Sequence, residues 1–122
     1  MESYYRDYIR TDSWRIEAKI SSDDKEWSEI QVSNISASGL LFSSGKQYKC
    51  GDTMWISLII APIVVGPDLT MKMKVQAEIN NDRGEQEGQH CYAVKFTEIS
   101  LGDQIRLDEL MRITVAKYGL VD

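Results

Sequence analysis

The sequence predicts an all-β domain, a six-stranded antiparallel β-barrel followed by a C-terminal α-helix. Three observations support this. Apolar and polar residues alternate with period two through most of the chain before residue 100, short polar segments separate these runs, and helical spacing begins only near the C-terminus. An antiparallel sheet that closes on itself removes its exposed edges, so a barrel is the expected arrangement.

The length of the chain indicates one domain. A chain of 122 residues builds a single core but is too short for two ordinary ones. Within the domain, residues 1–122, we expect an N-terminal arm over 1–12, the barrel over 13–97 and the helix over 100–118.

The first three predicted strands lie in the N-terminal half. Residues 14–20 and 27–32 each alternate apolar with polar side chains, and the polar turn "SSDDK" lies between them. Residues 40–42 form a short apolar strand, and the segment "GKQYKCGD" that follows is typical of a loop.

Three more strands and the helix complete the predicted fold. Residues 53–60 form a buried strand, Pro62 and Pro67 bracket a bend, and residues 71–79 and 90–96 alternate again. The polar run "NNDRGEQEG" between the last two strands is expected to be a loop. Ser100 and Asp103 give a helix start signal, and Gly119 gives a stop. The residues with i, i+3, i+4, i+7 spacing are Leu107, Leu110, Met111, Thr114 and Tyr118.

Charge and composition exclude several classes of protein. The net charge of −5 argues against a general DNA- or RNA-binding protein. The sequence has no apolar run of membrane-spanning length and no signal peptide, so we expect a cytoplasmic protein without membrane insertion. In that compartment Cys50 and Cys91 are expected to be buried free thiols.

No pattern of catalytic or metal-binding residues stands out. His90 is the single histidine, lies in a predicted strand, and is interpreted as structural. No serine, cysteine or carboxylate pair has triad, metal or acid–base spacing. We therefore expect no enzymatic activity, no catalytic residue, no metal and no cofactor.

Two short motifs remain, and they lie in a fixed order. Arg6 and Arg10 form an R-x-x-x-R pair just before the first predicted strand. Asn34, Ser36 and Gly39 form N-x-S-x-x-G between the second and third predicted strands. Either motif alone is weak, but both together, on a six-stranded barrel that ends in a helix, form a specific combination.

This combination resembles the PilZ domain, the bacterial receptor module for cyclic di-GMP, over nearly the whole chain. The resemblance implies a PilZ-like split barrel that binds cyclic di-GMP between the arm and the second motif. The implied ligand-binding residues are those of the two motifs: Arg6, Arg10, Asn34, Ser36 and Gly39. Tyr5, where many members carry another arginine, is a further candidate and leaves open whether one ligand or a stacked pair is bound.

The chemistry of the ligand agrees with these residue types. An arginine fork matches the O6 and N7 acceptors of guanine and also pairs with phosphate. The amide of Asn34 and the hydroxyl of Ser36 can form hydrogen bonds with polar groups of the ligand, and Gly39 permits the ligand to approach the backbone closely. A receptor without an output domain also implies a protein partner, in flagellar, exopolysaccharide or regulatory machinery.

Two other functions compete with the receptor. The first is a PilZ-like adaptor that binds a protein and no nucleotide, which the acidic charge and Tyr5 favour. The second is an oligonucleotide-binding barrel, which the charge disfavours. Its stacking residues would be Tyr8, Trp14, Trp27 and Tyr92.

Overall fold

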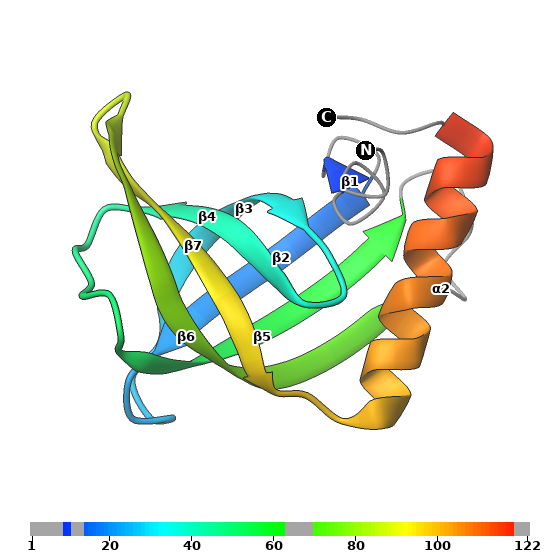
Figure 1. The fold of residues 1–122 in the computed structure, drawn as a ribbon, viewed down its shortest axis with the longest axis horizontal. Coiled ribbons are helices and arrows are strands. Elements are labelled where there is room, and N and C mark those ends of the chain that lie inside the picture. Colours follow the sequence, from blue (N-terminus) through cyan, green and yellow to red (C-terminus); the bar gives the residue numbers. More distant parts are fainter. Residues whose placement is uncertain (1–8, 11–13, 63–69, 119–122) are drawn as a thin grey trace.

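The computed structural model describes residues 9–10, 14–62 and 70–118, which form seven strands and one helix (Figure 1). The strands are β1 (Ile9–Arg10), β2 (Trp14–Ser21), β3 (Ser28–Ile35), β4 (Gly39–Ser44), β5 (Thr53–Pro62), β6 (Met71–Gln86) and β7 (Gln89–Glu98). The helix, α2, spans Leu101–Tyr118.

Six of the strands close into a barrel, as the sequence predicts. Each pairs antiparallel with its neighbours in the order β3, β2, β5, β6, β7, β4, and β4 pairs again with β3 to complete the circle. The short strand β1 adds to β3 beyond the point where β2 leaves it. The predicted fold class, a six-stranded antiparallel barrel with a C-terminal helix, is confirmed.

Period-two alternation places the core inside the barrel. In β5, Ile56, Leu58 and Ile60 are fully buried, and the polar or partly exposed residues between them face outward. In β6, Met71 and Val75 are buried in the same way. A fully buried side chain of this size contributes about 1.5–3 kcal/mol relative to an exposed one. The apolar face of each strand is therefore strongly favoured to point into the barrel.

The helix α2 covers one end of the barrel (Figure 1). Ser100 caps it, because its Oγ accepts a hydrogen bond from the backbone N–H of Asp103 at 3.1 Å. Leu107, Leu110 and Met111 are buried in the same core as the strands, as their helical spacing predicts. Gly119, the predicted stop, lies outside the described residues. No helix in the described part of the chain is long and apolar enough to cross a membrane.

The expectation of a loop at residues 80–88 is wrong. The strand β6 continues to Gln86, and only Glu87 and Gly88 form the turn to β7. Pairs such as Asp82 with Tyr92 and Gln86 with Gln89 hold this extension together. It forms a two-stranded ribbon that projects beyond the barrel at the upper left of Figure 1. Most of its β6 side chains are exposed, so no apolar alternation marks it in the sequence.

The burial predicted for the cysteines also needs correction. Both are free, but Cys50 is exposed in the loop between β4 and β5, and Cys91 is only half-buried. Cys91 faces outward because its neighbour Tyr92 takes the inward position on β7. There the Tyr92 hydroxyl accepts a hydrogen bond from the backbone N–H of Tyr48 at 2.8 Å.

Candidate functional site

Asn34 reaches the outer face of the barrel through a β-bulge. In the β3–β4 pairing Val32 stands opposite Phe42 but Asn34 stands opposite Leu41, so Ser33 is the extra residue. Strict alternation from Ile30 and Val32 would turn Asn34 inward. The extra residue shifts the alternation by one position, and Ile35 returns to the core with 0% exposure. Bulges commonly re-aim a side chain beside a functional site.

The two predicted motifs meet in the pairing of β1 with β3. Arg10 is the register partner of Asn34, and Ile9 is the partner of Ile35. Directly opposed residues of an antiparallel pair share a face of the sheet. Positions 10 and 34 therefore belong to one face. Arg6 and Tyr5, the other candidates of the arm, lie outside the described residues.

Ser36 forms the turn between β3 and β4. Its Oγ accepts hydrogen bonds from the backbone N–H groups of Ser38 at 3.1 Å and Gly39 at 3.2 Å. The N–H of Ser36 donates to the carbonyl of Gly39 at 2.8 Å. The side chain is 1% exposed. Its position is therefore explained by the turn, and the predicted contact with a ligand stays a prediction.

Gly39 is required by the neighbouring strand β7. A Cβ at this position would clash with the backbone carbonyl oxygen of Val94. The close approach is fixed by pairing of Gly39 with Lys95 and by a hydrogen bond from the N–H of Phe96 to the carbonyl of Ser38 at 2.8 Å. The glycine thus lets two strands meet. Its predicted role in admitting a nucleotide stays a prediction.

A hollow of about 560 Å³ opens beside Asn34, on the outer face of β3, β4 and β7. We call it the Asn34 hollow. Polar neutral side chains dominate its wall: Gln31, Ser33, Asn34, Ser43, Gln86 and Gln89. Arg83 and Glu87, from the β6–β7 ribbon, also line it. Its volume lies within the range of small-ligand pockets. Of the motif residues whose side chains are described, Asn34 lines this hollow.

The sequence pattern does not indicate the residues that the ribbon contributes to the Asn34 hollow. The run that contains Arg83, Gln86 and Glu87 has no apolar alternation, so it was interpreted as a loop. One signal is present in the sequence: the polar run ends in Glu87-Gly88, just before the strand predicted to begin at His90. A dipeptide that ends in glycine is typical of a two-residue hairpin turn.

The sequence matches the model of the PilZ domain over residues 5–112. This match covers most of the chain and includes both motifs. The chain belongs to the PilZ domain family. A search of curated proteins gives no match.

Solved structures show the same fold as this PilZ domain. The inhibitor of motility MotI/DgrA from Bacillus subtilis superimposes with a TM-score of 0.70 at 21% identity, covering 91% of this chain and 51% of MotI. MrkH, a c-di-GMP-dependent transcription regulatory factor, superimposes with a TM-score of 0.66 at 10% identity, covering 90% and 50%. The Legionella protein Lpg0364 gives 0.53 at 14% identity, covering 90% and 95%. The PilZ chain spans about half the length of MotI and MrkH.

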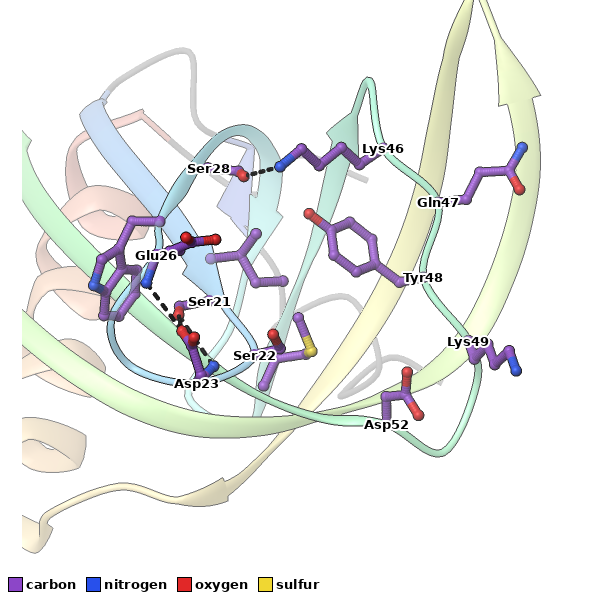
Figure 2. A pocket seen from close by; sticks show the side chains of 13 residues that line it. Ser21, Ser22, Asp23, Glu26, Ser28, Lys46, Gln47, Tyr48, Lys49 and Asp52 are labelled. Atoms are coloured by element: carbon purple, nitrogen blue, oxygen red, sulfur yellow. Dashed lines mark hydrogen bonds between the residues drawn. The ribbon is translucent and has the colours of Figure 1, made fainter.

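The PilZ barrel has a second hollow, of about 880 Å³, at its end away from α2 (Figure 2). It lies between the β2–β3 turn and the β4–β5 loop. Several of its polar groups already have partners. The Nζ of Lys46 donates to Ser28 Oγ at 2.7 Å, and Asp23 Oδ1 accepts from the N–H groups of Lys25 and Glu26, each at 2.9 Å. These last bonds, with one from Ser21, lower the pKa of Asp23.

The charge of this second hollow is unfavourable for an anionic ligand. Three carboxylates and two lysines line it: Asp23, Glu26, Asp52, Lys46 and Lys49. Carboxylates in excess repel phosphate. The residues of the two PilZ motifs do not line it in the described part of the chain. We therefore place the candidate site of this PilZ domain at the Asn34 hollow. Within the described residues, no group of three His, Cys, Asp or Glu side chains is placed to hold a metal ion.

Proposed function

We propose that this PilZ domain is a cyclic di-GMP receptor. The ligand lies on the outer face of the barrel, between the arm that carries Arg6 and Arg10 and the strand that carries Asn34. The observation that carries this proposal is the register of β1 with β3, because it sets Arg10 opposite Asn34. One position from each motif thus shares one face, beside a hollow of suitable size.

The chemistry of the ligand requires these groups. Cyclic di-GMP has two phosphates and two guanines, and the domain carries a net charge of −5. Local cations must therefore offset the overall field. Arginine provides both the charge for a phosphate and the fork for guanine O6 and N7. The Asn34 amide adds a donor and an acceptor for the base or the sugar–phosphate backbone.

Calorimetric titration with cyclic di-GMP tests the proposal, with GTP and cyclic di-AMP as controls. We expect saturable binding of cyclic di-GMP in the micromolar range or tighter, and weak or no binding of the controls. EDTA should leave the affinity unchanged, because the proposed site needs no metal and no cofactor. Wild-type protein that gives neither heat nor a thermal shift with cyclic di-GMP would falsify the receptor assignment.

A second candidate is an adaptor that binds a protein without nucleotide. One observation favours it: Ser36 and Gly39 both have complete structural roles in the β3–β4 turn and the β4–β7 pairing. Motif residues that folding alone explains do not require a ligand. The variant Arg10→Ala distinguishes the two functions. In an adaptor it should leave partner binding intact, and in a receptor it should abolish the dependence of partner binding on cyclic di-GMP.

The proposed receptor transmits its signal through a protein partner. It has no catalytic role in this proposal, so a changed surface around the bound ligand is its output. We expect the partner's affinity to differ between the free and bound states by about 1–3 kcal/mol, the usual range of allosteric coupling. By linkage, the partner must tighten cyclic di-GMP binding by the same factor. Affinity capture with and without ligand identifies the partner. Titrating the partner with and without cyclic di-GMP, and cyclic di-GMP with and without the partner, then measures this coupling.

A further inference from the structure

Two charged side chains of the β6–β7 ribbon face the Asn34 hollow. Among the described residues that line it, Arg83 is the only cation and Glu87 the only carboxylate. Both come from the segment that projects beyond the barrel (Figure 1). The remaining polar wall consists of amides and hydroxyls. A pocket with one cation, one anion and several neutral hydrogen-bonding groups matches the edge of a base better than a phosphate.

A second β-bulge presents Arg83. Asp82 pairs with Tyr92 and Glu85 pairs with His90, so Arg83 and Gly84 together stand opposite the single residue Cys91. Gly84 has a φ of 83°, and its N–H donates to Asp82 Oδ1 at 2.9 Å, which fixes the bulge. Asn34 and Arg83 thus both line the same hollow, each beside a β-bulge.

The guanidinium of Arg83 is available for a ligand. It makes no hydrogen bond or ion pair with another residue in the described part of the chain. The pairs that do occur there join Lys74 with Asp24 and Arg112 with Asp108. Within the described residues, the donors of the Arg83 fork therefore have no protein partner, and the residue lines the hollow.

Glu87 occupies a backbone position that its residue type rarely adopts. Its φ is 52° and that of Gly88 is 82°, as in a two-residue hairpin turn of type I′. Asn, Asp or Gly is strongly preferred at the first position of such a turn. The turn itself therefore does not require glutamate. Its carboxylate is the feature that asparagine would lack.

We propose that Arg83 and Glu87 form a guanine-reading pair on the β6–β7 ribbon. This inference rests on the proposed function as a cyclic di-GMP receptor. The Arg83 fork donates to O6 and N7 of one guanine, and the Glu87 carboxylate accepts from N1–H and the N2 amino group. Adenine presents an amino group where guanine has O6, and an acceptor where guanine has N1–H. The same pair therefore rejects adenine.

The test is calorimetric titration of four proteins: the wild type, Arg83→Ala, Glu87→Asn and the control Lys72→Ala. Lys72 is exposed on the same strand as Arg83, so its replacement removes the same charge away from the ribbon. Each protein is titrated with cyclic di-GMP and with cyclic di-IMP, which lacks the N2 amino group. Glu87→Asn suits the left-handed backbone, so its melting temperature should equal or exceed that of the wild type.

We expect Arg83→Ala and Glu87→Asn each to bind cyclic di-GMP about tenfold more weakly or worse, the scale for a bidentate base contact. Lys72→Ala should bind as the wild type does. The wild type should prefer cyclic di-GMP over cyclic di-IMP, and this preference should shrink in Glu87→Asn.

The contrary outcomes are separable. Wild-type affinity in both ribbon variants overturns this inference and leaves the receptor standing. An unchanged preference between the two ligands in Glu87→Asn overturns the role of Glu87 in reading guanine. A wild-type protein that binds neither dinucleotide overturns the receptor, and the guanine-reading pair with it.

Discussion

Arg10 and Asn34 stand directly opposite each other where β1 joins the barrel. One residue belongs to each of the two PilZ motifs, and the bulge at Ser33 turns Asn34 to the outer face at the same place. The β1–β3 pairing thereby brings one position of each motif together at the candidate site. A ligand bound there would contact both motifs at once.

Replacing Arg10 and Asn34, singly and together, should show that the two side chains act on the same ligand. Arg10→Ala should weaken cyclic di-GMP binding by about 1–3 kcal/mol through loss of the guanine or phosphate contact. Asn34→Ala should cost about 1–3 kcal/mol. Because the proposed ligand contacts both groups, the double variant should deviate from additivity by about 0.5–3 kcal/mol. Titration of all four proteins measures the coupling. Strict additivity would show that the two residues act at separate places.

Gly39→Ala should destabilise the barrel. The added methyl group would clash with the backbone oxygen of Val94, and a paired strand cannot move aside easily. We expect a loss of about 1–3 kcal/mol or more in the free energy of unfolding, measured in urea. Gly45→Ala is the matched control, since a Cβ at Gly45 would meet nothing within 4 Å. Its effect should stay within about 0.5 kcal/mol. Equal stability of the two variants would contradict the packing explanation.

Ser36→Ala should lower stability with or without ligand. Two backbone N–H groups, those of Ser38 and Gly39, would lose their acceptor at a position that is 1% exposed, where water cannot readily replace it. The expected loss is about 1–3 kcal/mol. Ser33→Ala removes an exposed hydroxyl whose hydrogen bond to the Leu41 carbonyl is long, at 3.5 Å, and should have little effect. Thermal unfolding of both variants without ligand makes the comparison. A destabilisation of Ser33→Ala as large as that of Ser36→Ala would count against this role.

Asp23 should make part of the stability depend on pH. Hydrogen bonds from the N–H groups of Glu26 and Lys25 and from Ser21 hold the pKa of its carboxyl below the ordinary 3.8. A carboxylate whose pKa is lowered by folding stabilises the fold above its unfolded pKa, and this contribution is lost as the pH falls through its folded pKa. The stability of the wild type relative to Asp23→Asn should therefore be greatest near neutral pH and decline below about pH 4. Melting curves across this range test it, and a difference that stays constant with pH would refute it.

The fold could be predicted because burial dominates the pattern of most strands. In β5 and the first half of β6, each inward residue is apolar and each outward residue is polar or half-exposed, so alternation identifies the strand. The helix was equally clear from Leu107, Leu110 and Met111. The extension of β6 over residues 80–86 was missed because backbone pairing, with little apolar burial, holds that ribbon.

The site was predictable in its motifs and less so in its geometry. The residues Asn34, Ser36 and Gly39 were recognised as a group. Their spacing did not reveal that Asn34 faces outward through a bulge, or that Ser36 and Gly39 serve the turn and the strand contact. One signal was present in the sequence. The apolar residues Ile30 and Val32 lie at even positions and Ile35 lies at an odd one, as expected when one extra residue interrupts the alternation. Arg83 was missed because its contact with the hollow depends on long-range strand pairing.

The attachment of β1 also limits where the first arginine of the arm can act. Arg6 precedes Arg10 by four residues, and an extended chain spans at most about 3.6 Å per residue, so the two Cα atoms stay within roughly 14 Å of each other. Arg10 is held at the barrel by the β1–β3 register. In the proposed receptor, a ligand that contacts Arg10 and Asn34 would meet Arg6 in an intramolecular step, at an effective concentration that short tethers raise to about the millimolar range. In the proposed receptor the arm would act as a bivalent clamp, and we expect that lengthening the segment between the two arginines weakens capture even with every side chain retained.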